Sequence, residues 1–466
     1  MKLGLVGQTY QAWSLPFDAE TCINLFPVIN QSGKEVAALY GTPGLAAFSV
    51  CGAGAVRGCF PSQNGRGFVV SGSTLYEIDA AGVATSRGSL NQSSGNISFA
   101  ENGLQLAICD GVTLYMFTYS SDAFAQVTSA NLPVCGTVTF IDSYFVVNEV
   151  DTGKFFISAQ YDGTTWAALD FATAESSPDD LVRVYNALGQ LWLLGTHTSE
   201  IWTNTGAAAF PFSKIAGGKM EVGIVAPHSV IAVSGSIIWL GEDEYGTGIV
   251  YQSSNISPQK ISTEAIDLLF QKATNKSEIR SYAYQEQGHI FIVFNGGGLT
   301  TSLVYDLTTK LWHERAYLNT EGVYEQHLSS CGMFIFGKFL VGDRNNGNVY
   351  NMSMDVYDDN GDAILRERAY THLIDEGKRI RYNNLEIGFE TGVGLQTGQG
   401  SDPKVALQLS KDGGQTWSTS FTTSIGAVGK YLTKVMFRRL GVSEQMTFRI
   451  RISDPVKVAI CGSYLT

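Results

Sequence analysis

Apolar and polar residues alternate in short runs over most of the first 350 residues, and turns rich in Gly, Asp and Asn separate the runs. The recurring unit is an apolar run, a turn, and a second run that carries an aromatic residue. Alternation with a period of two predicts β-strands, and a short turn between two such runs predicts a hairpin. The unit occurs seven times, with its aromatic residue at Tyr76, Tyr115, Phe156, Trp202, Tyr251, Tyr305 and Tyr350.

Neighbouring aromatic positions of this unit lie 39 to 54 residues apart. One four-stranded blade of a β-propeller takes roughly 40–50 residues. The spacing therefore predicts an all-β protein with a β-propeller of six to seven blades at residues 45–352. The alternative is an irregular β-sandwich in which strand, turn and aromatic residue recur without radial order.

The two ends of the chain lack the unit. Residues 1–44 predict an extended N-terminal arm that ends in a turn. After Tyr350 the pattern changes: Asn360-Gly361 predicts a tight hairpin, and later segments such as MTFRIRI alternate in the manner of strands. We expect a smaller C-terminal β-sandwich-like domain at 353–466. A short helix is expected at 262–273, with Ser262 or Thr263 as its N-cap.

Composition agrees with this fold class, because charged residues make up 16% of the chain, aromatic residues 11%, and Gly accounts for 51 positions. The charge is uneven. Residues 1–350 hold 17 Lys and Arg against 30 Asp and Glu, whereas 351–466 hold 14 against 13. An acidic surface repels phosphate, so the first part is not expected to bind DNA tightly. Such a surface would suit a conduit through which DNA slides.

The seven cysteines form no CxxC pair and no spacing typical of zinc, which favours reduced, mostly buried thiols and no metal. No apolar run approaches the roughly 18 residues that cross a bilayer, so no membrane span is expected. The N-terminus makes a poor signal peptide. We therefore expect synthesis in a cytoplasm.

Motifs for catalysis are missing: the chain contains no GxSxG and no HExxH, and its six histidines are scattered. A near-match to a phosphate loop at 332–338 is followed by Phe339 where Ser or Thr is needed, so a core strand is the better interpretation. We expect no enzymatic activity, no catalytic residue and no cofactor. Two acidic groups are interpreted as turns rather than as a calcium loop or an acid/base pair: Asp358 with Asn360 and Asp362, and Glu242 with Asp243 and Glu244.

The sharpest local motif fits the Asp-box pattern SxDxGxTW with Ser410, Asp412, Gly414, Thr416 and Trp417. It predicts a compact turn in which Asp412 and Ser410 bind turn amides, Gly414 adopts a positive φ, and Trp417 packs beneath. The motif resembles the Asp-box of sialidases and other carbohydrate-active propellers, where it is structural. A carbohydrate-binding or carbohydrate-cleaving propeller, such as a receptor-binding tail protein, is therefore the alternative function. A trimeric receptor-binding spike is a further one.

Longer segments carry a more specific likeness. The chain resembles the packaged-DNA stabilisation proteins of short-tailed bacteriophages, also called tail-hub or tail-nozzle proteins. The resemblance runs almost continuously from about 18 to 370 and rests on DAETCINLFP (18–27), FFISAQYDGTTWAALDFATAE (155–175), TSEIWTNTG (198–206), YDLTTKLWHER (305–315) and NGDAILRER (360–368).

The resemblance implies a structural virion protein of the tail that is made in the host bacterial cytoplasm. It implies six copies in a ring below the portal and its head-to-tail adaptor ring, which seal the packaged DNA and form the conduit for its ejection. It further implies tail fibres or spikes and a tail needle or plug as partners, and transient non-specific contact with genomic DNA in the lumen. The resemblance also implies that the chain has no catalytic residues.

A closed ring needs two complementary patches on each subunit, and the near-neutral C-terminal part offers a basic one. Its alternating strands carry four arginines. We expect these to lie partly at contacts with a neighbouring subunit or the adaptor ring, the alternative being the solvent face of amphipathic strands. They are Arg438, Arg439, Arg449 and Arg451.

Overall fold

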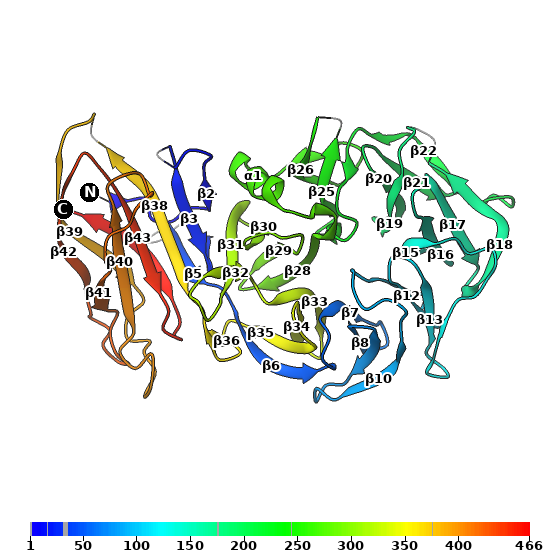
Figure 1. Ribbon diagram of the computed structural model, residues 1–466, viewed down its shortest axis with the longest axis horizontal. Helices are drawn as coiled ribbons and strands as arrows, with labels where there is room; N and C mark the ends of the chain where they lie inside the picture. The colour runs from blue at the N-terminus through cyan, green and yellow to red at the C-terminus, as the bar shows by residue number, and fades with distance from the viewer. Residues whose placement is uncertain (1, 16, 31–35, 175–176, 244, 375) are drawn as a thin grey trace.

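The computed structural model describes residues 2–15, 17–30, 36–174, 177–243, 245–374 and 376–466. Within them the chain forms a ring of sheets and, beside it, two packed sheets (Figure 1). One α-helix, α1 (Glu264–Lys272), and one 3₁₀ turn, η1 (Lys276–Glu278), are present in these ranges. No described helix is long and apolar enough to span a membrane.

Seven antiparallel blades make up the ring in the described part of the chain, and the first six each run in sequence from the innermost to the outermost strand (Figure 1). The first three blades are β7 (Val56–Pro61), β8 (Gly67–Ser71), β9 (Thr74–Ile78), β10 (Ala84–Ser89); β11 (Ser98–Glu101), β12 (Gln105–Cys109), β13 (Leu114–Thr118), β14 (Ala123–Gln126); and β15 (Cys135–Ile141), β16 (Tyr144–Glu149), β17 (Lys154–Ala159), β18 (Asp162–Thr173).

The next three blades follow the same order. They are β19 (Leu181–Ala187), β20 (Gln190–Gly195), β21 (Ser199–Asn204), β22 (Phe212–Met220); β23 (Gly223–Ile224) and β24 (Ile231–Val233) as a divided inner strand, β25 (Ser236–Asp243), β26 (Gly246–Ser253), β27 (Gln259–Lys260); and β28 (Arg280–Glu286), β29 (His289–Asn295), β30 (Ser302–Asp306), β31 (Leu311–Leu318). The short strand β32 (Tyr324–Gln326) pairs with β31.

The seventh blade joins distant parts of the chain. It consists of β33 (Ser329–Ile335), β34 (Lys338–Asp343), β35 (Asn348–Ser353) and, as its outermost strand, β6 (Gly44–Val50). β6 pairs antiparallel with β35, so that Tyr350 lies opposite Ala47. The N-terminal strand thereby closes the ring. The predicted fold class, a propeller of six to seven blades followed by a sandwich, is confirmed, with seven blades in the described residues.

The repeating unit predicted from the sequence corresponds to one place in each blade. All seven of its aromatic residues lie in the third strand from the centre, namely in β9, β13, β17, β21, β26, β30 and β35. In each case the preceding apolar run is the second strand, which is buried on both sides between neighbouring blades. One repeat of the sequence unit therefore corresponds to one blade of the ring.

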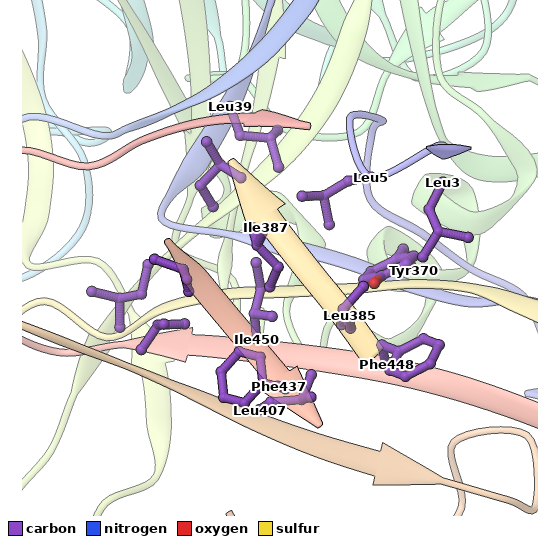
Figure 2. Close-up of a cluster of buried hydrophobic side chains, with 14 of the residues drawn as sticks. Leu3, Leu5, Leu39, Tyr370, Leu385, Ile387, Leu407, Phe437, Phe448 and Ile450 are labelled. Carbon is purple, nitrogen blue, oxygen red and sulfur yellow. The ribbon is translucent and has the colours of Figure 1, made fainter. Parts of the chain in front are cut away.

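Two sheets form the sandwich. One contains β38 (Arg366–Ile374), β43 (Gln445–Ile452), β40 (Lys404–Ser410) and β41 (Phe421–Ser424). The other contains β4 (Leu25–Ile29), β5 (Ala37–Gly41), β44 (Ala459–Leu465), β39 (Ile380–Phe389) and β42 (Val435–Ser443), with β1 (Lys2–Leu3) on β44. Their inner faces bury a shared core, to which Leu3, Leu39, Leu385, Phe437 and Ile450 contribute (Figure 2).

The N-terminal segment is more than the extended arm expected for residues 1–44. Besides β1, β4 and β5 in the sandwich, it supplies β2 (Tyr10–Gln11) and β3 (Ala19–Ile23). β3 lies between β31 of the sixth blade and β38 of the sandwich, which makes one continuous sheet of the two units. Because the chain crosses between the units in this way, the limits 45–352 and 353–466 remain a proposal.

Asn24 connects the two units just after β3. Its side chain is buried, its Nδ2 donates to the backbone oxygens of Ala316 (2.8 Å) and Leu365 (3.0 Å), and its Oδ1 accepts from the nitrogen of Ala316 (2.9 Å). Its φ of +54° lies in the left-handed region that Asn tolerates better than most residues. A single amide thus links blade six to the chain segment that enters the sandwich.

Arg368 holds the same N-terminal segment against the sandwich. Its side chain is fully buried, and its guanidinium donates to the backbone oxygens of Leu5 (2.8 Å), Gln8 (3.0 Å) and Thr21 (3.2 Å) and to Glu20 Oε2 (2.6 Å). A buried charge with this many acceptors is satisfied. Arg368 therefore stabilises the packing of the N-terminal segment within the chain.

Two local predictions are confirmed. Thr263 is the N-cap of α1, where its side chain accepts from the nitrogen of Ile266. Asn360 and Gly361 both adopt positive φ, +56° and +96°, between β36 (Asp358–Asp359) and β37 (Asp362–Ala363), as a tight hairpin requires. Both features depend on neighbouring residues alone, which is why the sequence displays them.

Candidate assembly surface

The Asp-box residues form the turn that follows β40 and precedes β41. Ser410 Oγ donates to Asp412 Oδ1 (2.7 Å) and accepts from the nitrogen of Gly414 (2.8 Å). Asp412 Oδ1 accepts from the nitrogen of Thr416 (2.9 Å), and the Thr416 hydroxyl also donates to this carboxylate. These hydrogen bonds from Thr416 and Ser410 lower the pKa of Asp412 to about 2.

The other two Asp-box residues fix the turn to its surroundings. Gly414 has a φ of +89°, and a Cβ at this position would lie 3.0 Å from the Cβ of Ala19 in β3. The ring of Trp417 lies beneath Arg449, whose Cζ is 4.0 Å from the ring centroid. The turn therefore packs on the sandwich and on the N-terminal segment, outside the seven blades.

Arg449 and Arg451 are engaged within the chain. Arg449 donates to Gln408 Oε1 through Nε (3.0 Å) and Nη2 (2.7 Å), and Arg451 Nε donates to Glu367 Oε2 (2.7 Å). Glu367 is buried and lies opposite Arg451 in the pairing of β38 with β43. Both arginines also act on Tyr324 of β32, where their positive charges oppose the rise in its pKa that burial causes. Both arginines therefore have partners within this chain.

Arg438 and Arg439 lie on β42, in the other sheet of the sandwich, and both side chains are exposed. The structure therefore does not bring the four predicted arginines together. It separates them into an internal pair and an exposed pair. Just before β42 the loop carries Tyr431 and Leu432, which are 71% and 95% exposed. An exposed apolar group rimmed by charge is typical of an interaction surface.

Of the acidic groups weighed as catalytic or metal sites, Asp243 and Asp358 accept hydrogen bonds from the backbone of hairpin turns. Asp243 Oδ1 accepts from the nitrogens of Tyr245 and Gly246, both at 2.9 Å, at the end of β25. Glu244 lies outside the described residues. Asp358 Oδ1 accepts from the nitrogen of Gly361 (2.7 Å). Within the ranges that the structure describes, no group of three His, Cys, Asp or Glu side chains could hold a metal ion.

Two family models match the chain in succession. The model described as "Bacteriophage P22 Gp10, beta-propeller" matches residues 1–357, and the model described as "Bacteriophage P22 Gp10, beta-sandwich" matches residues 366–466. The chain belongs to the P22 Gp10 family. This Gp10-family protein is thus a phage structural protein, and the resemblance noted in its sequence is confirmed.

Comparison with solved structures finds low overall similarity between the Gp10-family protein and the structures that it matches. The Pan2 WD40 domain of Neurospora crassa is 11% identical with a TM-score of 0.42, over 64% of this chain and 89% of that domain. The Cps50 (Swd1) propeller of Myceliophteria thermophila is 10% identical with a TM-score of 0.42, over 66% and 99%. The computationally designed Ika8 protein is 13% identical with a TM-score of 0.39, over 67% and 100%. No curated protein matches the chain significantly.

The sequence did not reveal that the arginines on β38 of the Gp10-family protein are buried. Arg366, Arg368 and Tyr370 lie two residues apart on β38, and all three side chains are buried. Their spacing was the available signal that the arginines share a buried face with Tyr370, because residues two apart in a strand point to the same side. The exposed pair on β42 and the internal pair on β43 both look basic in sequence. They differ in the partners that strand register gives them.

Proposed function

We propose that the protein is a subunit of a homohexameric ring in the phage tail that seals packaged DNA in the capsid and later conducts it out. The observation that carries this proposal is the succession of two Gp10-family models along one chain, one for each structural unit. The net charge of -12 supports a conduit, because an acidic wall does not retain DNA.

Ring closure requires a head-to-tail contact between two different surfaces of each subunit. In Figure 1, β42 and β18 lie at opposite ends of the longest axis. The first end carries Arg438 and Arg439 beside exposed Leu432, and the second carries Leu169, which is 83% exposed. We infer that these ends contact neighbouring molecules, either the next subunit or the head-to-tail adaptor ring. Arg449 and Arg451 are left out of this contact because they are bound internally.

The other partners of the proposed nozzle are tail fibres or spikes on its outer side and a needle or plug at its tip. Genomic DNA would touch the lumen transiently and without sequence preference. The role needs no catalytic residue. The carbohydrate alternative gains no support from the Asp-box, because that turn lies in the sandwich and not on the propeller ring.

Electron microscopy of assembled virions tests the proposal directly. We expect sixfold density for this protein at the tail vertex and nuclease-sensitive genomes in particles that lack it. Threefold density on a peripheral spike would contradict the nozzle and favour a receptor-binding role. Hydrolysis of host polysaccharide by the purified chain, abolished by changing one carboxylate, would contradict the non-enzymatic role.

The exposed arginines supply a second, finer test. Changing Arg438 and Arg439 together to Glu should leave the chain folded, because both side chains are exposed, but yield particles that package DNA and then leak it. The matched control changes Lys272 and Lys310, two exposed lysines of the propeller, to Glu. Normal genome retention by the arginine variant, measured by nuclease protection, would refute the assigned role of this surface. A salt-dependent defect is expected, since charge complementarity weakens with ionic strength.

A further inference from the structure

A cavity of about 400 Å³ lies at the centre of the propeller, among the inner strands of its blades. This volume is within the range of small-molecule sites. Its wall is divided into an aromatic part, with Phe60, Phe99 and Phe339, and a cationic part. The cationic part contains Arg57, Arg183, His228 and Arg280. No Asp or Glu lines the cavity within the described ranges.

Arg57 has all the partners it needs. Its guanidinium donates to the backbone oxygens of Gln92 (2.6 Å), Gly95 (2.7 Å) and Gly72 (3.0 Å), and also to that of Ser94. These bonds hold the segment between β10 and β11 against the first blade. Arg57 is therefore a structural arginine that contributes charge to the cavity but few free donors.

Arg183 and Arg280 are different. Arg183 is 8% exposed, and its Nε and Nη1 have no hydrogen-bond partner among the residues that the structure describes. The same is true of Nε of Arg280, whose Nη1 makes one long contact of 3.4 Å with the backbone oxygen of Arg57. The neighbour of the Arg183 guanidinium is the ring of Tyr185, at 5.6 Å. Buried guanidinium donors without acceptors are costly unless an anion meets them.

His228 completes the cationic part. It lies between β23 and β24, where the inner strand of the fifth blade is divided, and it forms a parallel bridge with Arg280 of the sixth blade. Burial, together with the charges of Arg183 and Arg280, holds the pKa of His228 well below its ordinary value. The imidazole is therefore neutral at physiological pH and has one N–H to donate. Arg183, Arg280 and His228 all line the same cavity.

We propose that the propeller cavity binds one small oxyanion, a phosphate or carboxylate group, between Arg183 and Arg280, with His228 as an additional donor. The planar fork of each guanidinium presents paired N–H groups that match the oxygens of such an anion. The aromatic part of the wall would accept an apolar body attached to the anion. This site is separate from the proposed ring contacts, which lie on the outer ends of the molecule.

Calorimetric titration of the full chain tests the site. The probes are inorganic phosphate, sulfate and acetate, with chloride at matched ionic strength as the blank. We expect one oxyanion per chain, and the preferred probe distinguishes a phosphate-type from a carboxylate-type ligand. Arg183→Met and Arg280→Met should each weaken binding at least about tenfold, because each removes charge-assisted hydrogen bonds. Arg381→Met removes the same charge from an exposed position and should leave binding unchanged.

The unfolding temperature gives an independent test, because the Arg183 substitution is not expected to lower it. In buffer without oxyanions, Arg183→Met should unfold at the same temperature as wild type or higher, because it removes an unpaired buried charge. It should lose the rise in unfolding temperature that the bound oxyanion gives wild type. Failure of all three probes to bind wild type would overturn the proposal, as would unchanged binding in both variants. Competition by duplex DNA would overturn it too, because a duplex can reach an outer surface but not this cavity. Should Arg183→Met fail to fold, wild type and Arg280→Met decide the matter.

Discussion

Replacement of Asn24 by Ala should destabilise the protein by about 4–5 kcal/mol. The amide makes three buried hydrogen bonds, to both backbone groups of Ala316 and to the oxygen of Leu365. Each contributes about 1 kcal/mol net to stability, which gives about 3 kcal/mol. Ala at a φ of +54° adds backbone strain of about 1–2 kcal/mol, which Asn largely avoids.

Asn24→Gly separates the two contributions. It loses the same three hydrogen bonds but tolerates the positive φ, and part of this advantage is offset by the greater chain entropy of Gly in the unfolded state. We expect it to be more stable than Asn24→Ala by about 0.5–1 kcal/mol. Asn383→Ala, which removes an exposed amide in the sandwich, is the control and should change stability by less than about 0.5 kcal/mol.

Equilibrium urea unfolding of the full chain, followed by tryptophan fluorescence and by circular dichroism, measures these differences. Because Asn24 links the sixth blade to the segment that enters the sandwich, the Ala variant should also lose coincidence between the two probes. If Asn24→Ala lowers the free energy of unfolding by less than about 1 kcal/mol, the contribution assigned to the three hydrogen bonds is refuted. Equal stability of the Ala and Gly variants would refute the contribution from backbone strain.

Two predictions concern titration. Hydrogen bonds from Thr416 hold the pKa of Asp412 at about 2, so the stability that its carboxylate adds is present above about pH 4 and is lost as the pH falls towards 2. The difference in unfolding temperature between wild type and Asp412→Asn should therefore narrow over that range. A difference that does not depend on pH would contradict this prediction. The Sγ atoms of Cys59 and Cys331 lie 3.0 Å apart, within hydrogen-bond distance, and this contact lowers the pKa of Cys331 to about 7. Iodoacetamide should label Cys331 increasingly as the pH rises through 7 but spare Cys22, whose pKa burial raises to about 12; mass spectrometry showing equal labelling of both would refute this.

The sequence predicted the blades because their signal is local. Each hairpin needs alternating residues and a turn within about 15 positions, and one aromatic residue recurs in the third strand of every blade. The Asp-box turn and the cap of α1 were visible for the same reason. Closure of the ring by β6 was not, because its pairing with β35 joins the two ends of the propeller and leaves no pattern near either strand.

The candidate surface was predictable in part. The sequence identified four arginines, but it could not show that Glu367 lies opposite Arg451, because that contact depends on the register between β38 and β43. The cavity arginines were beyond sequence reasoning as well. Arg183 and Arg280 lie on inner strands of different blades, and closure of the ring brings them to one cavity.

The pairing of β6 with β35 also constrains how the protein is made. β6 emerges from the ribosome early, whereas its partner β35 is the last propeller strand to be synthesised, so six blades can form while β6 still lacks the three inner strands of its own blade. Strands β3 and β5 wait longer, because their sandwich partners β38 and β44 are synthesised after the propeller. During this interval their edges and apolar faces are exposed in the host cell, where unpaired strand edges promote aggregation. Yield during infection should therefore depend on chaperones that protect the N-terminal segment until translation ends.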